Sequence, residues 1–340
     1  MTTRLGTPYL LFLGESADPI DTKTARGILQ WRPEWCAGEL SLGAPSLGLP
    51  AMTPREAAAA GVRTLVVGTV SAGGLLPDHW VATLIEAVEA GLDVAAGMHR
   101  RLNDIEPLRR ACEGTGRSLF DVREPGRSFP VGNGRKRTGK RLLTVGTDCS
   151  VGKMYTTLAL ERGLRARDVN AHFKATGQTG ILIAGEGVPV DAVVADFISG
   201  SVEVLSPDAP GEWHLIEGQG SLHHAAYAGV TLGLIHGAQP DWLVVCHEPT
   251  RKHPRHLPHM KMPTPRASML AALEAAALTN PGVRCLGFAV NTSRLDDAGA
   301  RAFLDALAQQ EGLPATDPVR YGVDELVEAL FATEAIASRA

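Results

Sequence analysis

The chain has 340 residues, enough for about two domains with sizeable hydrophobic cores. Its apolar fraction of 44%, charged fraction of 21% and net charge of −4 are ordinary for a soluble globular protein and give no electrostatic reason to expect nucleic acid or an anionic membrane as a partner. No apolar run approaches 18 residues, and the first short one, at residues 9–13, predicts a strand and not a signal peptide. We therefore expect a cytoplasmic protein that acts on a small molecule.

Strand-like and helix-like segments alternate in the first half of the chain. The predicted strands are residues 9–13, 64–67, 92–95 and 118–122, and the predicted helices are residues 81–90 and 105–113. Such alternation is typical of a parallel sheet with helices on both faces, so we expect a Rossmann-like α/β domain. Residues 124–140 then combine prolines, glycines and basic residues with little apolar content, which indicates an inter-domain linker.

The second half repeats this architecture. Strands are expected at residues 141–145, 170–175, 214–217, 242–247 and 285–290, and helices at residues 153–167, 266–278, 297–310 and 324–340. We predict a Rossmann-like domain over residues 1–135 and a P-loop domain with a mostly parallel sheet over residues 136–340. A homo-oligomer is the default expectation for an enzyme of this kind.

A glycine-rich segment follows the predicted strand 141–145 and precedes a predicted helix. This order lets consecutive backbone N–H groups face an anion, while the helix N-terminus and a lysine supply positive charge. Five residues separate the two glycines instead of the usual four, a spacing that resembles the loop of dethiobiotin-synthetase-like proteins. We predict that the loop binds cofactor phosphates through Gly146, Thr147, Asp148, Cys149, Ser150, Val151, Gly152, Lys153 and Met154.

Met154 follows the lysine at the position where P-loop NTPases place the Ser or Thr that holds Mg²⁺. The loop therefore suits binding of a phosphorylated molecule better than metal-assisted phosphoryl transfer, and we expect no metal. The five cysteines are scattered and form no C-x-x-C pair, so they indicate neither disulfides nor a zinc site. Cys149 lies inside the loop, where the helix dipole and Lys153 would lower the pKa of its thiol, so a catalytic thiolate is an alternative to a filler role.

Polar side chains follow two further strands of the second half. Residues 174–180 offer Lys174, Thr176, Gln178 and Thr179 on a glycine-rich turn, which we predict to bind substrate at the carboxyl edge of the sheet. Residues 215–224 end a strand in a carboxylate and then present two imidazoles. We predict Glu217, His223 or His224 as the catalytic base, with Asp196 and His99 next in order; structural roles for the histidines remain the alternative.

Residues 246–259 hold four histidines and three cations among prolines. Proline spacing argues against a helix that would align the imidazoles as metal ligands. The cations suit carboxylate or phosphate recognition, because an Arg guanidinium can bind a carboxylate with two parallel hydrogen bonds. A merely solvated basic loop is the alternative interpretation.

Several of these segments together resemble a P-loop family long described as a domain of unknown function, which includes D-glutamate N-acetyltransferase. The similar segments are the P-loop and residues 24–28, 31–34, 96–99, 173–181, 191–197 and 217–222, so the resemblance extends over almost the whole chain. It implies transfer of the acetyl group of acetyl-CoA to the amine of D-glutamate, in D-amino-acid catabolism. It assigns no catalytic residue.

The residues agree with that chemistry. A P-loop can hold the phosphates of coenzyme A without Mg²⁺, and attack of an amine on a thioester needs a deprotonated amine and a stabilised oxyanion. An acceptor with two carboxylates needs cations, for which Lys23, Arg32 and Arg251, with Lys252 and Arg255, are the candidates. Two other functions stay open: an ATP- or GTP-dependent kinase or ligase of the dethiobiotin-synthetase type, and a nucleotide-responsive binding module or metallochaperone.

Overall fold

The computed structural model describes residues 5–18, 21–69, 76–98 and 100–337. The chain forms two compact units. Unit 1 comprises residues 1–126 together with residues 177–192, and unit 2 comprises residues 127–176 together with residues 193–340. Unit 1 therefore takes in a segment that the sequence-based division at residues 135 and 136 assigns to the C-terminal domain.

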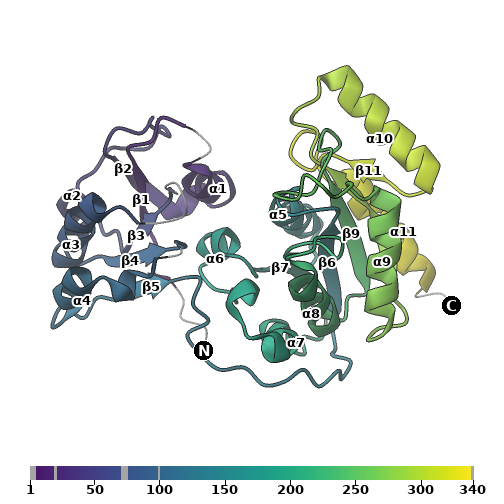
Figure 1. Ribbon diagram of the computed structural model, residues 1–340, viewed down its shortest axis with the longest axis horizontal. Helices are drawn as coiled ribbons and strands as arrows, with labels where there is room; N and C mark the ends of the chain where they lie inside the picture. The colour runs from purple at the N-terminus through teal and green to yellow at the C-terminus, as the bar shows by residue number, and fades with distance from the viewer. Residues whose placement is uncertain (1–4, 19–20, 70–75, 99, 338–340) are drawn as a thin grey trace. The chain divides into compact units, whose positions relative to one another are not determined.

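Unit 1 is built on a five-stranded parallel sheet with strand order β2-β1-β3-β4-β5. Its strands are β1 (Tyr9–Gly14), β2 (Cys36–Ser41), β3 (Thr64–Val67), β4 (Asp93–Ala96) and β5 (Leu119–Asp121). Its helices are α1 (Lys23–Trp31), α2 (Pro54–Ala59), α3 (Val81–Glu89), α4 (Glu106–Cys112) and α6 (Gln178–Ala184). Figure 1 shows α2, α3 and α4 on one face of this sheet and α1 on the other.

The core of unit 1 follows from strands that are buried on both faces. Leu10 and Phe12 of β1 and Leu65 of β3 are fully buried in one cluster with Leu84 of α3 and Leu108 of α4. Burial of an apolar side chain of this size contributes about 1.5–3 kcal/mol, so these contacts hold the helices on the sheet.

Helix α6 comes from the second half of the sequence but packs on unit 1. The backbone N–H of Leu5 donates to the carbonyl of Gly185, and the hydroxyl of Tyr9 donates to the carbonyl of Leu182. The polar turn predicted over residues 174–180 is wrong from Gln178 onward, where the helix begins.

Unit 2 contains a six-stranded parallel sheet with strand order β11-β10-β9-β6-β8-β7. Its strands are β6 (Lys140–Gly146), β7 (Ala171–Lys174), β8 (Trp213–Ile216), β9 (Trp242–His247), β10 (Arg284–Val290) and β11 (Ala315–Thr316). Its helices are α5 (Lys153–Arg165), α7 (Ile198–Leu205), α8 (Ala228–Ala238), α9 (Pro265–Ala277), α10 (Asp297–Glu311) and α11 (Asp324–Ala337). Helices α8 and α9 pack together on the sheet, and α5 packs with α11.

The predicted linker, residues 124–140, has no helix before β6 and is nevertheless pinned to unit 2 from residue 127 onward. Arg137 donates to the carbonyls of Ser206 and Gly237. Arg141 is 1% exposed and donates to the hydroxyl of Ser206 and the carbonyl of Pro207. These buried guanidiniums tie the start of β6 to the segment that follows α7.

Because all strands of unit 2 are parallel, the loops that follow β6, β8, β9, β10 and β11 meet at one edge of the sheet. This edge is where the chemistry-bearing residues gather. Among the described residues, no helix is both long and apolar enough to cross a membrane.

Candidate functional site

The loop after β6 adopts the conformation that its glycines permit. Gly152 has a φ of +106°, a left-handed conformation, and directly precedes α5. A Cβ at Gly146 would lie 2.9 Å from Val151 and 3.1 Å from the carbonyl of Cys246, so only glycine fits at the end of β6. The loop therefore wraps closely around the N-terminus of α5, where an anion is stabilised.

Lys153 begins α5 and turns back into the loop. Its ammonium donates to the carbonyl of Asp148 across 2.7 Å, and the residue is only 6% exposed. Burial is the largest influence on the pKa of Lys153 and lowers it, while the nearby Asp148 and Glu217 carboxylates raise it. The carbonyl that accepts from Lys153 is neutral, so the anionic oxygens of a bound phosphate would give this buried cation a charged partner.

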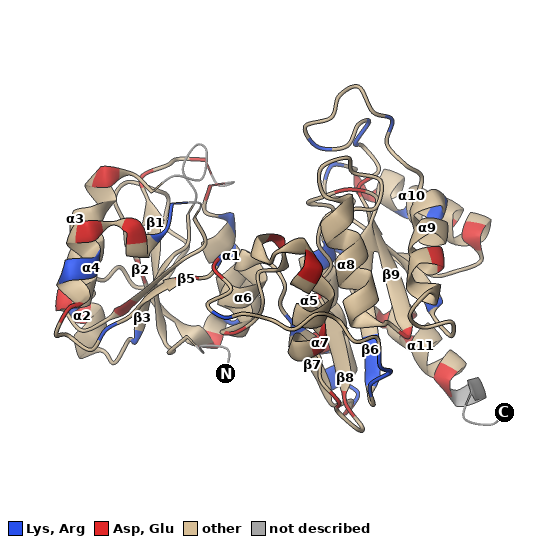
Figure 2. Cartoon of the chain, turned by 60° about the horizontal axis from the view of Figure 1, so that its bottom comes forward, with Lys and Arg blue, Asp and Glu red and all other residues tan. Residues whose placement is uncertain are grey.

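The long basic loop between β9 and α9, shown with its Lys and Arg residues in Figure 2, clamps the phosphate loop. Arg251 donates to the Asp148 carboxylate and to the carbonyl of Cys149, both across 2.6 Å, and to the carbonyl of Ser150 across 3.1 Å. Arg255 donates to the hydroxyl of Ser150 across 2.8 Å. These contacts make both arginines part of the support of the phosphate loop.

Near the start of the loop, the buried side chain of Thr147 contacts the buried imidazole of His247. The hydroxyl of Thr147 lies 3.0 Å from Nδ1 of His247, whose ring stacks on Phe303 at 5.9 Å. Burial lowers the pKa of His247 to about 4, so this imidazole is neutral at physiological pH and supports the loop without adding charge.

Glu217 follows β8 and lies beside the phosphate loop. It is 4% exposed, and one of its carboxylate oxygens accepts the backbone N–H of Thr176 across 2.9 Å. The next residue, Gly218, passes so close to β6 that a Cβ there would be 1.7 Å from the carbonyl of Thr144 and 2.9 Å from Lys153. Glycine at position 218 therefore lets the loop after β8 approach the phosphate loop, so that Glu217 and Lys153 line the same cavity.

A cavity of about 380 Å³ opens between these two loops. The phosphate loop lines it with Cys149, Ser150, Gly152, Lys153 and Met154, and the loop after β8 lines it with Glu217, Gly218, Gln219 and Gly220. Met154 thus places a thioether at the position where a hydroxyl would hold Mg²⁺, and a thioether is a poor ligand for a hard cation.

The two predicted histidines differ from Glu217 in their surroundings. Both ring nitrogens of His224 are engaged: Nδ1 accepts the backbone N–H of Ala226, and Nε2 donates to the carbonyl of Arg255. His223 is half-buried, and its Nε2 has no hydrogen-bond partner within the described residues. Neither residue lines the cavity that holds Glu217. Asp196 is exposed, and His99 lies outside the described residues.

Within the described chain, one group of potential metal ligands lies close together: Asp148, Cys149 and His224. The hydrogen bonds argue against a metal there, since one Asp148 oxygen is bonded to Arg251 and both His224 nitrogens are engaged. The group contains no histidine of the segment 246–259.

Burial raises the pKa of the Cys149 thiol, so the lowered pKa predicted for a catalytic thiolate is wrong.

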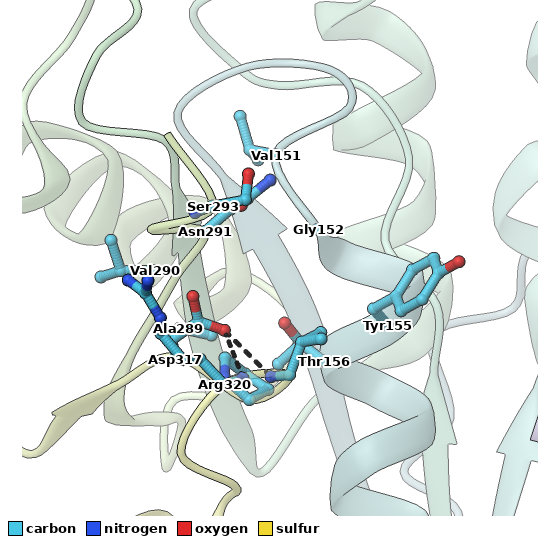
Figure 3. A pocket seen from close by; sticks show the side chains of 12 residues that line it. Val151, Gly152, Tyr155, Thr156, Ala289, Val290, Asn291, Ser293, Asp317 and Arg320 are labelled. Atoms are coloured by element: carbon cyan, nitrogen blue, oxygen red, sulfur yellow. Dashed lines mark hydrogen bonds between the residues drawn. The ribbon is translucent and has the colours of Figure 1, made fainter. Parts of the chain in front are cut away.

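A second cavity of about 450 Å³ adjoins the first and shares Gly152, Tyr155 and Asn291 with it. Figure 3 shows Asn291, after β10, near Val151 of the phosphate loop, and Asp317 and Arg320 at the other side. Asp317 accepts hydrogen bonds from the backbone N–H groups of Thr292, Val319 and Arg320, and so ties the loop after β10 to the loop after β11.

The residues predicted to bind substrate do not form one cluster within a unit. In unit 1, Lys23 begins α1, Arg32 follows its end, and Gln178 and Thr179 begin α6; the hydroxyl of Thr179 lies 3.4 Å from that of Thr24. In unit 2, Lys174 ends β7 and Thr176 donates its hydroxyl to the carbonyl of Glu217. The carbonyl of Lys174 also accepts the backbone N–H of Glu217 across 3.0 Å, so the structure brings both Lys174 and Thr176 directly to Glu217.

The loop 317–320 lines the second cavity and is not predicted from the sequence. Its strand, β11, has only two residues, too few for a periodic pattern to be recognised. A signal was present in the Asp-Pro pair at residues 317–318, since such pairs favour a turn after a strand.

Comparisons with known proteins cover both halves of the chain. A family model described as the P-loop domain of a domain of unknown function, DUF1611_C, matches residues 130–327, and one described as the Rossmann-like DUF1611_N matches residues 36–125. The matches confirm the predicted α/β fold class. A crystal structure of a DUF1611 family protein from Anabaena variabilis superposes with a TM-score of 0.84 at 31% identity, covering 96% of this chain and 100% of that one.

Two curated relatives are similar over nearly the full length, and both are named D-glutamate N-acetyltransferase. The protein from Tritonibacter scottomollicae is 50% identical over 330 residues, which are 96% of this chain and 99% of the relative. The protein from a Pseudoalteromonas species is 46% identical over 326 residues, covering 95% and 98% of the two chains.

Proposed function

The chain belongs to the DUF1611 family and is an acetyltransferase, and we propose that it moves the acetyl group of acetyl-CoA to the amine of D-glutamate, as a step of D-amino-acid catabolism. The observation behind this proposal is the cavity of about 380 Å³ that contains both Lys153 and Glu217. A buried cation at a helix N-terminus fits the diphosphate of the donor, and a buried carboxylate fits the proton transfer that the acceptor needs.

Donor binding follows from the phosphate loop. The diphosphate of coenzyme A would accept hydrogen bonds from the loop N–H groups and from the ammonium of Lys153. Binding in this way exchanges the carbonyl partner of Lys153 for anionic oxygens, and charge-assisted hydrogen bonds are about twice as strong as neutral ones. Met154 leaves no hydroxyl for Mg²⁺ at the usual position, which agrees with a donor that is bound and not hydrolysed.

The transfer itself requires a proton to leave the acceptor. Glu217 takes a proton from the ammonium of D-glutamate, and the free amine attacks the thioester carbonyl carbon. A C–N bond forms and the C–S bond breaks. The attacking nitrogen loses its second proton to give the neutral amide, and that proton protonates the departing coenzyme A thiolate. Since thiols have pKa values near about 8.5, the leaving group needs little assistance. Glu217 is the candidate base because it lines the cavity, whereas His223 and His224 do not.

The test is an assay of the purified protein with acetyl-CoA and D-glutamate. Release of the coenzyme A thiol is followed with a disulfide reagent, and mass spectrometry identifies N-acetyl-D-glutamate. We expect product with D-glutamate and far less with L-glutamate. Thiol release without acetylated product, or turnover only with ATP and Mg²⁺, would contradict the proposal.

A further inference from the structure

The larger cavity of unit 2 is not used by the chemistry described above. It has a volume of about 450 Å³ and adjoins the phosphate-loop cavity, because Gly152, Tyr155 and Asn291 line both. A molecule whose phosphates occupy the loop therefore has room to extend over Tyr155 and Asn291 into this second space.

The walls of the cavity are rigid and largely apolar. Val290 ends β10 and is fully buried, and Pro318 and Val319 form the opposite loop. Val319 is 60% exposed although it is apolar. The four hydrogen bonds that Asp317 accepts, from the backbone N–H and hydroxyl of Thr292 and the N–H groups of Val319 and Arg320, keep the two walls apart at a fixed spacing. An apolar cavity of this kind suits a heterocyclic ring, which would cover Val319.

Asn291 supplies a polar group at the junction of the two cavities. Its side-chain oxygen accepts the backbone N–H of Ser293 across 3.1 Å, which orients the amide and leaves the Nδ2 donor for a ligand. Its own backbone N–H donates to the carbonyl of His247. A donor fixed in this way can pair with a ring nitrogen of a purine.

Arg320 supplies a cation at the same cavity. One nitrogen, Nη1, lies 3.2 Å from the carbonyl of Leu295 and 3.5 Å from that of Asp296, so the guanidinium is positioned by backbone groups. The side chain is nevertheless exposed, and its remaining N–H groups can bind an anion. Tyr321 stacks against it at 5.8 Å.

We propose that this cavity binds the 3′-phosphoadenosine portion of the acyl donor, with Asn291 contacting adenine and Arg320 contacting the ribose 3′-phosphate. The proposal rests on the proposed function, because the donor there is acetyl-CoA. It adds a basis for specificity: coenzyme A carries a ribose 3′-phosphate and ATP does not, so Arg320 would make the site prefer coenzyme A to an adenine nucleotide that the phosphate loop alone would accept.

The test measures dissociation constants of coenzyme A and of dephospho-coenzyme A, which lacks the 3′-phosphate, by isothermal titration. Arg320→Ala should weaken coenzyme A by about 10- to 100-fold, the range for one charge-assisted contact, and change dephospho-coenzyme A by less than about twofold. Asn291→Ala should weaken both ligands by about 10-fold. Arg301→Ala is the matched control: Arg301 stacks on the same Tyr321 ring at 4.5 Å but does not line the cavity, so both ligands should bind as before.

Arg320 also holds the loop after β10, so Arg320→Lys is tested in parallel; it keeps the charge and should restore part of the preference for coenzyme A. Equal weakening of both ligands by Arg320→Ala, or no effect, would overturn the assignment of the 3′-phosphate. Unchanged binding by Asn291→Ala would overturn the assignment of adenine. These titrations contain no D-glutamate. A protein that binds coenzyme A as expected but forms no acetylated product would thus contradict the proposed function and not the cavity assignment.

Discussion

Arg251 and Asp148 form an ion pair of 2.6 Å in which the carboxylate is fully buried and the guanidinium is 22% exposed. The two residues are 103 positions apart in the sequence. The pair joins the basic loop after β9 to the phosphate loop, and it places the guanidinium of Arg251 against the carbonyls of the phosphate loop. The shape of the phosphate site therefore depends on a residue outside the P-loop motif.

Removal of this clamp should loosen the phosphate loop. Arg251→Ala leaves Asp148 with fewer partners, and we expect it to lower the free energy of unfolding by about 2 kcal/mol and to weaken acetyl-CoA binding. Urea denaturation and titration calorimetry measure the two effects. Lys252→Ala, at the exposed neighbouring position, should change neither. Equal effects of the two substitutions would show that the net charge of the loop matters and the clamp does not.

Lys153→Ala should weaken acetyl-CoA binding by about 1.5–3 kcal/mol, because one charge-assisted contact with phosphate is lost. Met154→Ala, at the next position of the same cavity, should have a mild effect, since we assign that side chain no metal. Calorimetry in the presence and absence of Mg²⁺ measures both. Unchanged affinity in Lys153→Ala would mean that the phosphates bind elsewhere.

Glu217→Gln tests the proton transfer. The amide oxygen of Gln can still accept the N–H of Thr176, so we expect the fold and the acetyl-CoA affinity to be kept while kcat falls by about 10²- to 10⁴-fold. The acidic limb of the pH–rate curve should disappear as well. Glu274→Gln, an exposed carboxylate on α9, is the control and should be silent. If Glu217→Gln turned over at the parental rate, approximation of the two substrates would be the better account of catalysis.

His247 should make stability depend on pH. Its pKa is lowered to about 4 in the folded protein from the ordinary value of 6.5, so between these values the unfolded chain binds the extra proton. Stability should therefore fall as the pH drops from about 6.5 to about 4, by an amount on the order of 3 kcal/mol, and become independent of this group below that range. His247→Gln should flatten the dependence in urea titrations. His259→Gln, at an exposed position, should not change it.

Gly218→Ala should disrupt the contact between the loop after β8 and β6. Its Cβ would lie 1.7 Å from the carbonyl of Thr144, and backbone cannot move aside at low cost, so we expect a loss of about 3 kcal/mol in the free energy of unfolding. Gly229→Ala, in α8, meets no atom within 4 Å and should stabilise the protein by about 0.5–1 kcal/mol. Similar losses for both would mean that the loop adjusts.

Local patterns determined much of this protein from the sequence. The sequence predicts the strand over residues 242–247 with its observed bounds, because the five consecutive apolar residues 242–246 form a recognisable run. The phosphate loop was recognisable because its backbone conformation depends on glycines within the loop itself, such as Gly152. These features involve residues that are near one another in the chain, so their spacing is visible in the sequence.

Tertiary structure decided the rest. Helix α6 has a glycine on each side of it and one within it, and it is nevertheless helical where it packs against α1, which begins more than 150 residues earlier. From the sequence, Glu217, His223 and His224 are equal candidates for the catalytic base. Only the structure shows that Glu217 lines the phosphate-loop cavity. It also shows that hydrogen bonds occupy both ring nitrogens of His224. A residue type indicates which chemistry a side chain can perform, but burial and hydrogen-bond partners, which come from distant parts of the chain, determine whether it is free to do so.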